Sequence, residues 1–289
     1  MADSIQAAIV SYRRSGSISR HTLRMTDRLG LKATVIVAEE EYDEYVAALP
    51  GRDIAVGRLG MVENRHAMLS MFPAGTRVLA LNDDMKDVVY STGEAGRIMP
   101  LDPLAFHRRA EYGFSLLDYF GGAIWGINPS ADRRFLANAS QFSVGINSVE
   151  GCFFGFVAGR TDALMLPEDE DNRTFEDMER ICKAWTAGWN IIRLNQISYT
   201  QSRAMVGGRG AWEQGDECAK VLRVVRDYPR VAAHTFSKLT SQPKCRVNIR
   251  RRCTVANPTS LGQVDELRDK IMRGPIPQIP PVCTTGLSV

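Results

Sequence analysis

The chain has 289 residues, of which 44% are hydrophobic and 24% charged, and its formal net charge is +3. This composition is ordinary for a soluble globular protein with one large domain or two modest ones. No apolar run approaches the roughly 20 residues that a membrane-spanning helix needs, and the first apolar stretch is too short for a signal peptide. We therefore expect a cytoplasmic protein that does not bind membranes.

The spacing of the cysteines and the distribution of charge bear on the cellular compartment and on possible partners. The six cysteines form no CxxC pair and indicate free thiols of a reducing compartment. Residues 220–252 are rich in Lys and Arg and contain a single acid, Asp227. Such a segment is typical either of a solvated charged face or of a surface that binds a polyanion.

The N-terminal part alternates between strand and helix patterns. Residues 6–11 (QAAIVS) predict a buried strand, followed by a helix that Ser17 caps and Gly30 ends. Residues 33–37 predict a second strand, and the apolar helical stripe after it ends at Pro50.

The alternation continues with a strand at 53–56, a helix at 62–72 and a strand at 78–81, which leads directly into Asp83 and Asp84. This order predicts βαβ units and a mostly parallel sheet covered by helices. Ligands of such sheets bind beyond the carboxyl ends of the strands, where the polar turns of this chain also fall.

The pattern is looser in the second half. The elements expected there are a loop at 91–102, a helix at 112–120, a glycine-broken strand at 149–157, a helix at 175–187 and a strand from 190. After residue 232 the chain becomes basic and then Pro-rich (GPIPQIPPV), and we expect it to end as an extended tail.

Two polar turns and one helix start suggest a site for a phosphorylated ligand. Asp83 and Asp84 suit Mg²⁺ or Mn²⁺ shared with phosphate oxygens, although the pair could equally cap the next segment or pair with Lys86. The turn SYRR offers backbone amides and arginines for a nucleotide, or is simply an exposed basic loop. Arg65 lies near a helix start, where phosphate is favoured, or is a solvated helix residue. The turn residues concerned are Ser11, Tyr12, Arg13 and Arg14.

The succession AAIVSYRR, VIVAEEEYDEY, GMVENRHAML and VLALNDDM resembles the GT-A glycosyltransferases. More narrowly, it resembles the TET-associated glycosyltransferases of bacteriophages, relatives of the base J glucosyltransferase. The resemblance covers residues 7–194 and is most specific before residue 90. It implies an α/β, Rossmann-like GT-A fold (nucleotide-diphospho-sugar transferase), with a mixed sheet flanked by helices. Residues 1–240 would form this domain, and 241–289 a basic, then Pro-rich C-terminal extension.

The function implied by this resemblance is metal-dependent transfer of a sugar from a UDP-sugar to DNA. The acceptor would be hydroxymethylcytosine or hydroxymethyluracil, and the reaction would take place in the host cytoplasm if the chain is encoded by a phage. The partners implied are a nucleotide-sugar, Mn²⁺ or Mg²⁺, and DNA.

The resemblance also assigns roles to residues around the donor. The D-x-D signature of the family falls on Asn82, Asp83 and Asp84, so that Asp84 is the principal metal ligand and Asp83 lies beside it. Asn82 departs from the signature, and its amide would contact a ribose hydroxyl. Glu40 would contact the donor nucleotide, and His234 would complete the metal site, unless it is a structural histidine.

For the acceptor side, the resemblance implies an acid at the start of the helix in TFEDMERICKAW. Asp177 would be the base of an inverting reaction, with Glu176 and Asp169 as rivals, although acids in a first helical turn are also ordinary caps. The segment GGAIWGIN would form the acceptor wall, with Trp125 and Asn128, or Trp125 fills the core.

The basic segment KCRVNIRRRC is the expected DNA contact. Alternation along a strand would place Arg246, Arg250 and Arg252 on one side, with Arg251 beside them, to contact phosphates. The alternatives are a GT-A enzyme acting on a protein, lipid or polysaccharide, and a non-catalytic nucleic-acid-binding protein. A HAD-type phosphatase fits poorly, because its paired aspartates usually follow the first strand.

Overall fold

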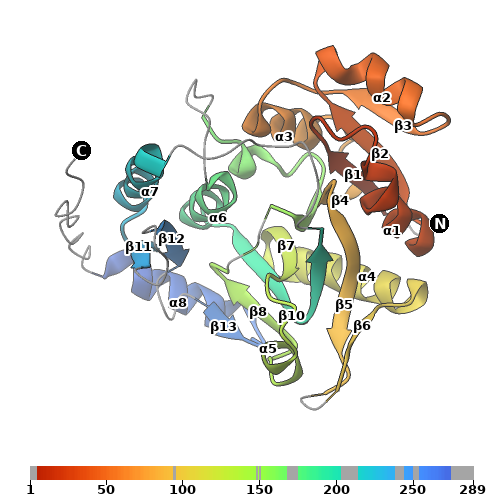
Figure 1. The fold of residues 1–289 in the computed structure, drawn as a ribbon. Helices are drawn as coiled ribbons and strands as arrows, with labels where there is room; N and C mark the ends of the chain where they lie inside the picture. The colour runs from red at the N-terminus through yellow and green to blue at the C-terminus, as the bar shows by residue number, and fades with distance from the viewer. Residues whose placement is uncertain are drawn as a thin grey trace.

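The computed structural model describes residues 5–93, 96–147, Val149, 151–167, 175–202, 214–237, 244–249 and 254–274. Figure 1 shows a twisted central sheet with helices packed against it. Helices α1 and α4 contact each other on one side of the sheet, and α3 contacts β1 and β2. In the part of the chain described, no helix combines the length and apolar content needed to cross a bilayer.

The N-terminal half has the βα alternation predicted from the sequence. Strand β1 pairs in parallel with β2 and with β4, and β2 pairs in parallel with β3. The elements are β1 Gln6–Val10, η1 Ile18–Arg20, α1 Thr22–Leu29, β2 Lys32–Val37, η2 Glu39–Glu41, α2 Tyr42–Ala48, β3 Asp53–Val56, α3 Met61–Ser70 and β4 Arg77–Asn82. The apolar runs of β1, β2 and β4 are buried because helices cover the sheet.

The second half makes the sheet mixed. Strand β9 is antiparallel to both β4 and β7, and β10 is parallel to β7 but antiparallel to β5 and β8. The elements are β5 Met85–Ser91, β6 Ile98–Pro100, α4 Pro103–Phe120, β7 Gly122–Asn128, α5 Arg133–Ala137, β8 Phe142–Gly145, β9 Phe153–Val157, η3 Asp162–Leu164, α6 Glu176–Thr186 and β10 Asn190–Gln201. Among the described residues, eleven strands belong to this sheet.

The expectation of a loop at 91–102 and a helix at 112–120 was partly wrong. Residues 98–100 form β6, and α4 already begins at Pro103. The side chain of Asp102 accepts a hydrogen bond from the backbone N–H of Ala105, and proline is well tolerated at the first helical position. A cap and a proline at 102–103 were therefore the local signal for this helix start.

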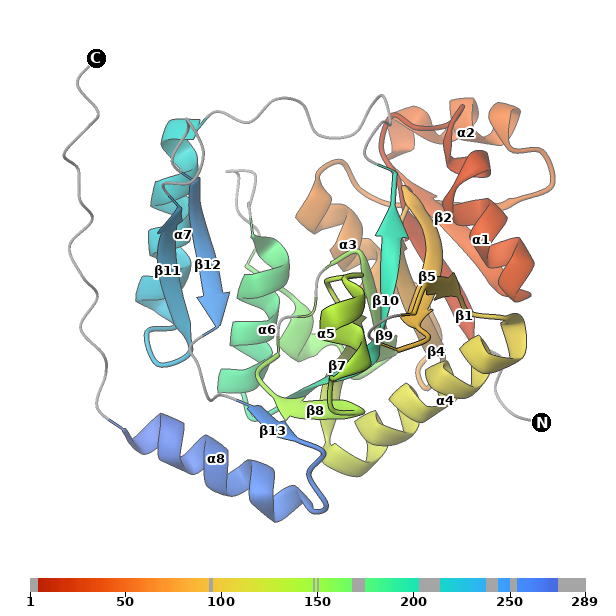
Figure 2. The ribbon, with the colours of Figure 1, turned by 60° about the horizontal axis from the view of Figure 1, so that its bottom comes forward.

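The C-terminal elements are α7 Gln214–Asp227, β11 Ala232–Ser237, β12 Lys244–Ile249, β13 Thr254–Ala256 and α8 Leu261–Arg273. Strands β11 and β12 form a separate antiparallel pair beside α7, whereas β13 joins the edge of the central sheet by pairing with β8. Figure 2 shows β11 and β12 well apart from β1, β2 and β4. The Pro-rich tail lies outside the described residues, and the boundary at residue 240 stays a prediction.

Candidate functional site

Three turns meet at the edge of the sheet where β1, β2 and β4 end. Val10, the last residue of β1, lies opposite Ile36 in β2 and Asn82 in β4. The SYRR turn, η2 and the turn between β4 and β5 follow these strands, as the sequence predicted. Open α/β sheets bind ligands at this edge, so it is the candidate ligand site.

Asp83 is held by residues from the SYRR turn. Ser11 Oγ donates a hydrogen bond to Asp83 Oδ2 at 2.6 Å, and the guanidinium of Arg14 forms an ion pair with the same carboxylate. Asp83 is only 5% exposed, and burial of a carboxylate is costly unless hydrogen bonds and an opposite charge compensate it. The structure thus brings together three residues that the sequence assigned to the site.

Two further residues of this site were missed by the sequence reasoning. The hydroxyl of Tyr45 lies 2.7 Å from Ser11 Oγ and accepts a hydrogen bond from the backbone N–H of Arg14 at 2.9 Å. Glu41 Oε1 accepts one from the backbone N–H of Arg13, also at 2.9 Å. Burial raises the pKa of Tyr45 to about 12, so its hydroxyl stays protonated, and burial also raises the pKa of Glu41.

Asp84 is less well compensated than its neighbour. Gln201 Nε2, at the end of β10, donates a hydrogen bond to Asp84 Oδ1 at 3.2 Å, and Arg14 Nη1 lies 3.7 Å from Oδ2. Burial, together with the negative charge of Asp83, raises the pKa of Asp84. The side chain of Asp84 is 19% exposed, so a cation arriving from solvent can reach it.

The acid pair fits a divalent cation that also binds a ligand phosphate. Mg²⁺ is usually held by one or two carboxylates together with phosphate and water oxygens. Asp83 and Asp84 supply two carboxylates, and within the described ranges no group of three or more His, Cys, Asp or Glu side chains could hold a metal. The raised pKa of Asp84 reflects a carboxylate in need of positive charge, which such an ion would provide.

A second cluster, built around Arg65, connects α3 to the start of α6. Arg65 Nε lies 2.8 Å from Glu176 Oε1, Nη1 donates to the carbonyl of Gly151 at 2.8 Å, and Nη2 donates to Asn82 Oδ1 at 3.1 Å. Arg65 is 6% exposed. Nε contacts Glu176 as an ion pair without a hydrogen bond to a described residue, whereas Nη1 and Nη2 donate to protein oxygens. The assignment of Arg65 to a ligand phosphate stays a prediction.

The carboxylate of Glu176 is likewise bound by protein side chains. One carboxylate oxygen pairs with Arg65 and the other with Arg180, which is 2% exposed. These two cations lower the pKa of Glu176 against the opposing effect of its burial. A carboxylate held between two buried guanidinium groups is a structural counter-ion rather than a proton acceptor for a substrate.

Asp177, by contrast, forms no ion pair with the residues that the structure describes, although the charge of Arg65 acts on it. Its Oδ1 accepts a hydrogen bond from the N–H of Met178 at 2.8 Å, and its Oδ2 accepts one from the N–H of Gly151 at 3.4 Å. Burial, with the charge of Glu176 next to it, raises the pKa of Asp177 to about 6. The residue is partly exposed, and a general base works best when its pKa lies near the working pH.

The placement of Trp125 in an acceptor wall is corrected by the structure. Trp125 is 1% exposed and packs edge-on against Phe114 and Phe153. Gly113 and Gly155 face its indole so closely that a Cβ at either position would overlap the ring. The tryptophan fills the core. Asn128 lies at the end of β7, where its Nδ2 donates to the carbonyl of Asn195 at 3.1 Å.

His234 is not brought to the acid pair. It lies on β11, which pairs with β12 and packs beside α7, and Figures 1 and 2 both show this strand far from the turn between β4 and β5. Its assignment as a metal ligand is therefore wrong for this structure. Glu40 is exposed on η2, and the guanidinium of Arg13 lies 4.9 Å from the ring centre of Tyr12.

Five expected site residues lie on segments whose side chains are outside the described part of the chain. Arg246 is on β12, whose side chains are outside the description. The remaining arginines of the basic segment and the rival base are outside the described residues altogether: Arg250, Arg251, Arg252 and Asp169.

The fold is similar to solved structures at low sequence identity. S. aureus TarS, residues 1–349, in complex with UDP-GlcNAc, matches with a TM-score of 0.51 at 11% identity, over 78% of this chain and 65% of that one. The match thus spans less than two thirds of TarS 1–349. GalNAc-T7 with UDP, GalNAc and Mn²⁺ matches over 77% of this chain and 47% of its own at 14% identity, but its TM-score of 0.40 is too low to support an argument.

No protein-family model and no curated protein matches the sequence. The likeness to TarS, at this identity, establishes the fold: a mixed central sheet flanked by helices, as the resemblance to GT-A glycosyltransferases implied.

Proposed function

We propose that the protein is a glycosyltransferase that moves a sugar from a UDP-sugar to a hydroxymethylated pyrimidine in DNA. The observation that carries the proposal is the junction of the SYRR turn with Asp83 and Asp84 at the carboxyl edge of the sheet. The fold shared with TarS, which was solved with UDP-GlcNAc, supports a nucleotide-sugar donor and makes UDP-GlcNAc the first one to test.

The donor nucleotide would lie across the turns after β1 and β2. Arg13 is exposed, and with Arg14 it supplies positive charge for a diphosphate. Glu41 Oε2 is buried and finds no hydrogen-bond partner among the described residues. This oxygen would accept an N–H from a pyrimidine base, so that Glu41 takes over the contact with the donor nucleotide that the resemblance implied for Glu40.

Asp84, with Asp83 beside it, would hold Mg²⁺ or Mn²⁺. When bound there, the ion supplies positive charge that neutralises a diphosphate leaving group. The protein's part is to position both carboxylates, which Ser11, Arg14 and Gln201 do through their hydrogen bonds and ion pairs.

Asp177 would act as the general base. The acceptor hydroxyl oxygen forms a bond to the anomeric carbon, Asp177 takes the hydroxyl proton, and the bond to UDP breaks with its electron pair remaining on the diphosphate. Attack from the face opposite UDP inverts the configuration. The pKa of about 6 suits this role, since the carboxylate is ionised at neutral pH and still basic enough to accept a proton.

The DNA acceptor rests on the resemblance of the first ninety residues to phage enzymes and on the basic segment that contains Arg246, Arg250, Arg251 and Arg252. A protein or polysaccharide acceptor keeps the same donor site. A non-catalytic nucleic-acid-binding protein needs neither the acid pair nor a raised pKa at Asp177.

The test is mass spectrometry of nucleosides after incubation of hydroxymethylcytosine or hydroxymethyluracil DNA with Mn²⁺ and each common UDP-sugar, beginning with UDP-GlcNAc. We expect a glycosylated nucleoside with the wild-type protein and none with Asp84→Asn. Asp162→Asn, which neutralises an exposed aspartate in η3, serves as a matched control and should transfer normally. UDP-sugar hydrolysis without any modified nucleoside would keep the donor assignment and refute the DNA acceptor.

A further inference from the structure

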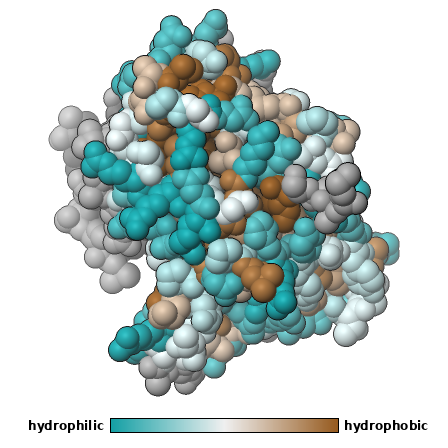
Figure 3. Space-filling model, turned by 90° about the vertical axis from the view of Figure 1, so that its right-hand side faces the viewer, coloured by the Kyte–Doolittle hydropathy of each residue, from teal (hydrophilic) through white to brown (hydrophobic). Residues whose placement is uncertain are grey.

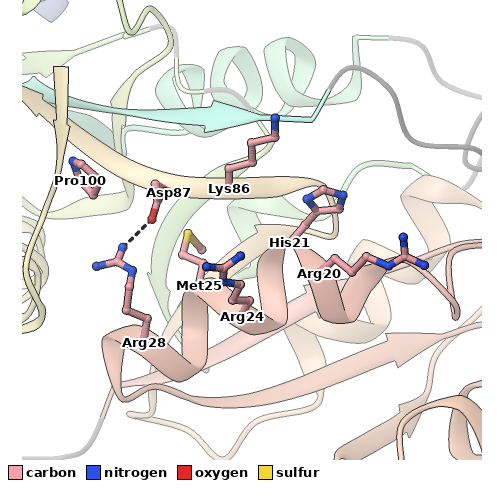
Figure 4. Close-up of a pocket in the computed structure, with 8 residues that line it drawn as sticks. All are labelled: Arg20, His21, Arg24, Met25, Arg28, Lys86, Asp87 and Pro100. Carbon is pink, nitrogen blue, oxygen red and sulfur yellow. Dashed lines mark hydrogen bonds and ion pairs between the residues drawn. The ribbon is translucent and has the colours of Figure 1, made fainter. Parts of the chain in front are cut away.

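A basic hollow lies beside the turn between β4 and β5. It has a volume of about 580 Å³ and is enclosed by η1 and α1 on one side and by β5 and β6 on the other. Arg20, Arg24 and Arg28 line it from the helical side, and Lys86 and Asp87 line it from β5 (Figure 4). We call it the α1–β5 pocket. It faces a side of the molecule on which strongly hydrophilic residues gather (Figure 3).

Three of its four cations form no ion pair with the part of the chain that the structure describes. Arg28 donates to Asp87 Oδ1 at 2.7 Å and to the carbonyl of Leu101 at 2.8 Å, so its charge is satisfied within the protein. Arg20, Arg24 and Lys86 are exposed, and none of them forms an ion pair with a described residue. Cations gathered around one hollow repel one another, and anionic groups that enter it relieve this repulsion.

The α1–β5 pocket lies next to the candidate active site, because hydrogen bonds join the start of α1 to the turn between β4 and β5. Thr22, the first residue of α1, donates from Oγ1 to the carbonyl of Asn82 at 2.7 Å and accepts from the N–H of Met85 at 2.9 Å. These bonds hold the start of α1 against the turn that carries Asp83 and Asp84. Lys86 follows Asp84 by two residues, so a chain-like ligand that reaches the acid pair can continue into the pocket.

We infer that the α1–β5 pocket binds the phosphodiester backbone of the acceptor DNA strand, through Arg20, Arg24 and Lys86. This inference rests on the proposed function and adds a binding site to it. Arg24 and Arg28 lie one turn of α1 apart, about 6 Å along the axis, and Arg20 lies on η1, which precedes α1 across His21. Backbone charges follow one another at an axial spacing of about 3.4 Å per strand, and a pocket of about 580 Å³ has room for more than a single phosphate.

The test is a titration of DNA at several salt concentrations with the triple variant Arg20→Ala/Arg24→Ala/Lys86→Ala. Each phosphate contact adds about 0.7 to the log–log salt slope for single-stranded DNA and about 0.9 for duplex DNA. Loss of three contacts should therefore flatten the slope by about 2 and about 3, respectively. Affinity should fall equally for modified and unmodified DNA, because phosphate contacts carry no base information.

The control is Lys32→Ala/Arg108→Ala/Lys270→Ala, which removes three exposed cations on β2, α4 and α8 that do not line the pocket. It changes the net charge by the same amount and should keep the wild-type slope. Equal slopes for both variants would overturn the inference, as would a wild-type protein that binds a poly(glycerol phosphate) chain but not DNA.

A second measurement separates this inference from the proposed function. The melting temperature of the pocket variant should still rise on addition of UDP and Mn²⁺, because the substituted residues lie outside the donor turns. If wild-type protein binds UDP and glycosylates DNA while the pocket variant keeps the wild-type salt slope, the pocket assignment fails alone. If wild-type protein binds DNA through the pocket but shows no response to UDP, the proposed function fails alone.

Discussion

Asp177→Asn should stabilise the protein at alkaline pH while it abolishes most of the activity. The pKa of Asp177 is raised from 3.8 to about 6, because burial and the charge of Glu176 disfavour its ionised form. A difference of about 2 pKa units corresponds to about 3 kcal/mol between the protonation states. At pH 8 the wild-type fold bears this cost of an ionised carboxylate, and an amide of the same shape does not.

The dependence on pH has a definite sign. Between pH 3.8 and 6 the folded protein holds a proton at Asp177 that the unfolded chain has released. Stability from this group is therefore present at low pH and is lost as the pH rises through about 6. Raising the pH from 4.5 to 8 should remove about 2 kcal/mol from the wild-type protein relative to Asp177→Asn.

The assay is urea unfolding of both proteins at pH 4.5 and 8, with Asp162→Asn as a control for removal of an exposed carboxylate. Turnover of Asp177→Asn should fall by about 10²–10⁴, the range for loss of a general base. Wild-type kcat/KM should rise with pH up to about 6 and then level. Near-normal turnover would refute the catalytic role, and identical pH dependence of stability in both proteins would refute the raised pKa.

Three further substitutions test the structural network. Tyr45→Phe removes the hydroxyl that links the SYRR turn to α2. We expect the free energy of unfolding in urea to fall by about 1–3 kcal/mol and UDP binding to weaken. Unchanged UDP affinity would contradict the place of Tyr45 in the site. Glu176→Gln leaves Arg65 and Arg180 without their counter-ion, so the free energy of unfolding should fall by about 3–5 kcal/mol. A change below about 0.5 kcal/mol would show that the ion pairs of Glu176 do not stabilise the fold. Gly155→Ala places a Cβ 2.0 Å from the indole nitrogen of Trp125 and should lower the free energy of unfolding by about 1–3 kcal/mol. Gly16→Ala is the control, because its Cβ has no described atom within 4 Å. Equal melting temperatures of the two variants would refute the tight packing of Gly155 against Trp125.

The sequence was most informative where structure is local. Apolar runs separated by helical stripes predicted the first four strands, and the parallel pairing of β1 with β2 and β4 then places their polar turns at one edge. Within those turns the choice between neighbours was harder. Glu40 and Glu41 are adjacent, but the 3-10 turn exposes the first and buries the second. Tyr45 lies on the helical stripe that the sequence predicts between the second strand and Pro50, but its hydroxyl is a polar tip that reaches Ser11.

Contacts between distant segments could not be predicted from local pattern. Gln201 reaches Asp84 across 117 positions, because β10 extends far enough to pair with β5. Trp125 is flanked by glycines in its own segment, but Gly113 and Gly155, which make room for its ring, come from α4 and β9. Its burial therefore depends on the packing of three elements, and its sequence neighbourhood does not reveal it.

A calorimetric titration of UDP with and without Mn²⁺ measures whether the edge of the sheet after β1 and β4 is a metal-dependent nucleotide site. The acid pair and the SYRR turn should bind UDP more tightly with Mn²⁺, and Asp84→Ala should lose this metal-dependent gain while keeping a wild-type circular dichroism spectrum. Failure of wild-type protein to bind UDP under either condition, or an undiminished Mn²⁺ effect in Asp84→Ala, would contradict the donor site at this edge of the sheet.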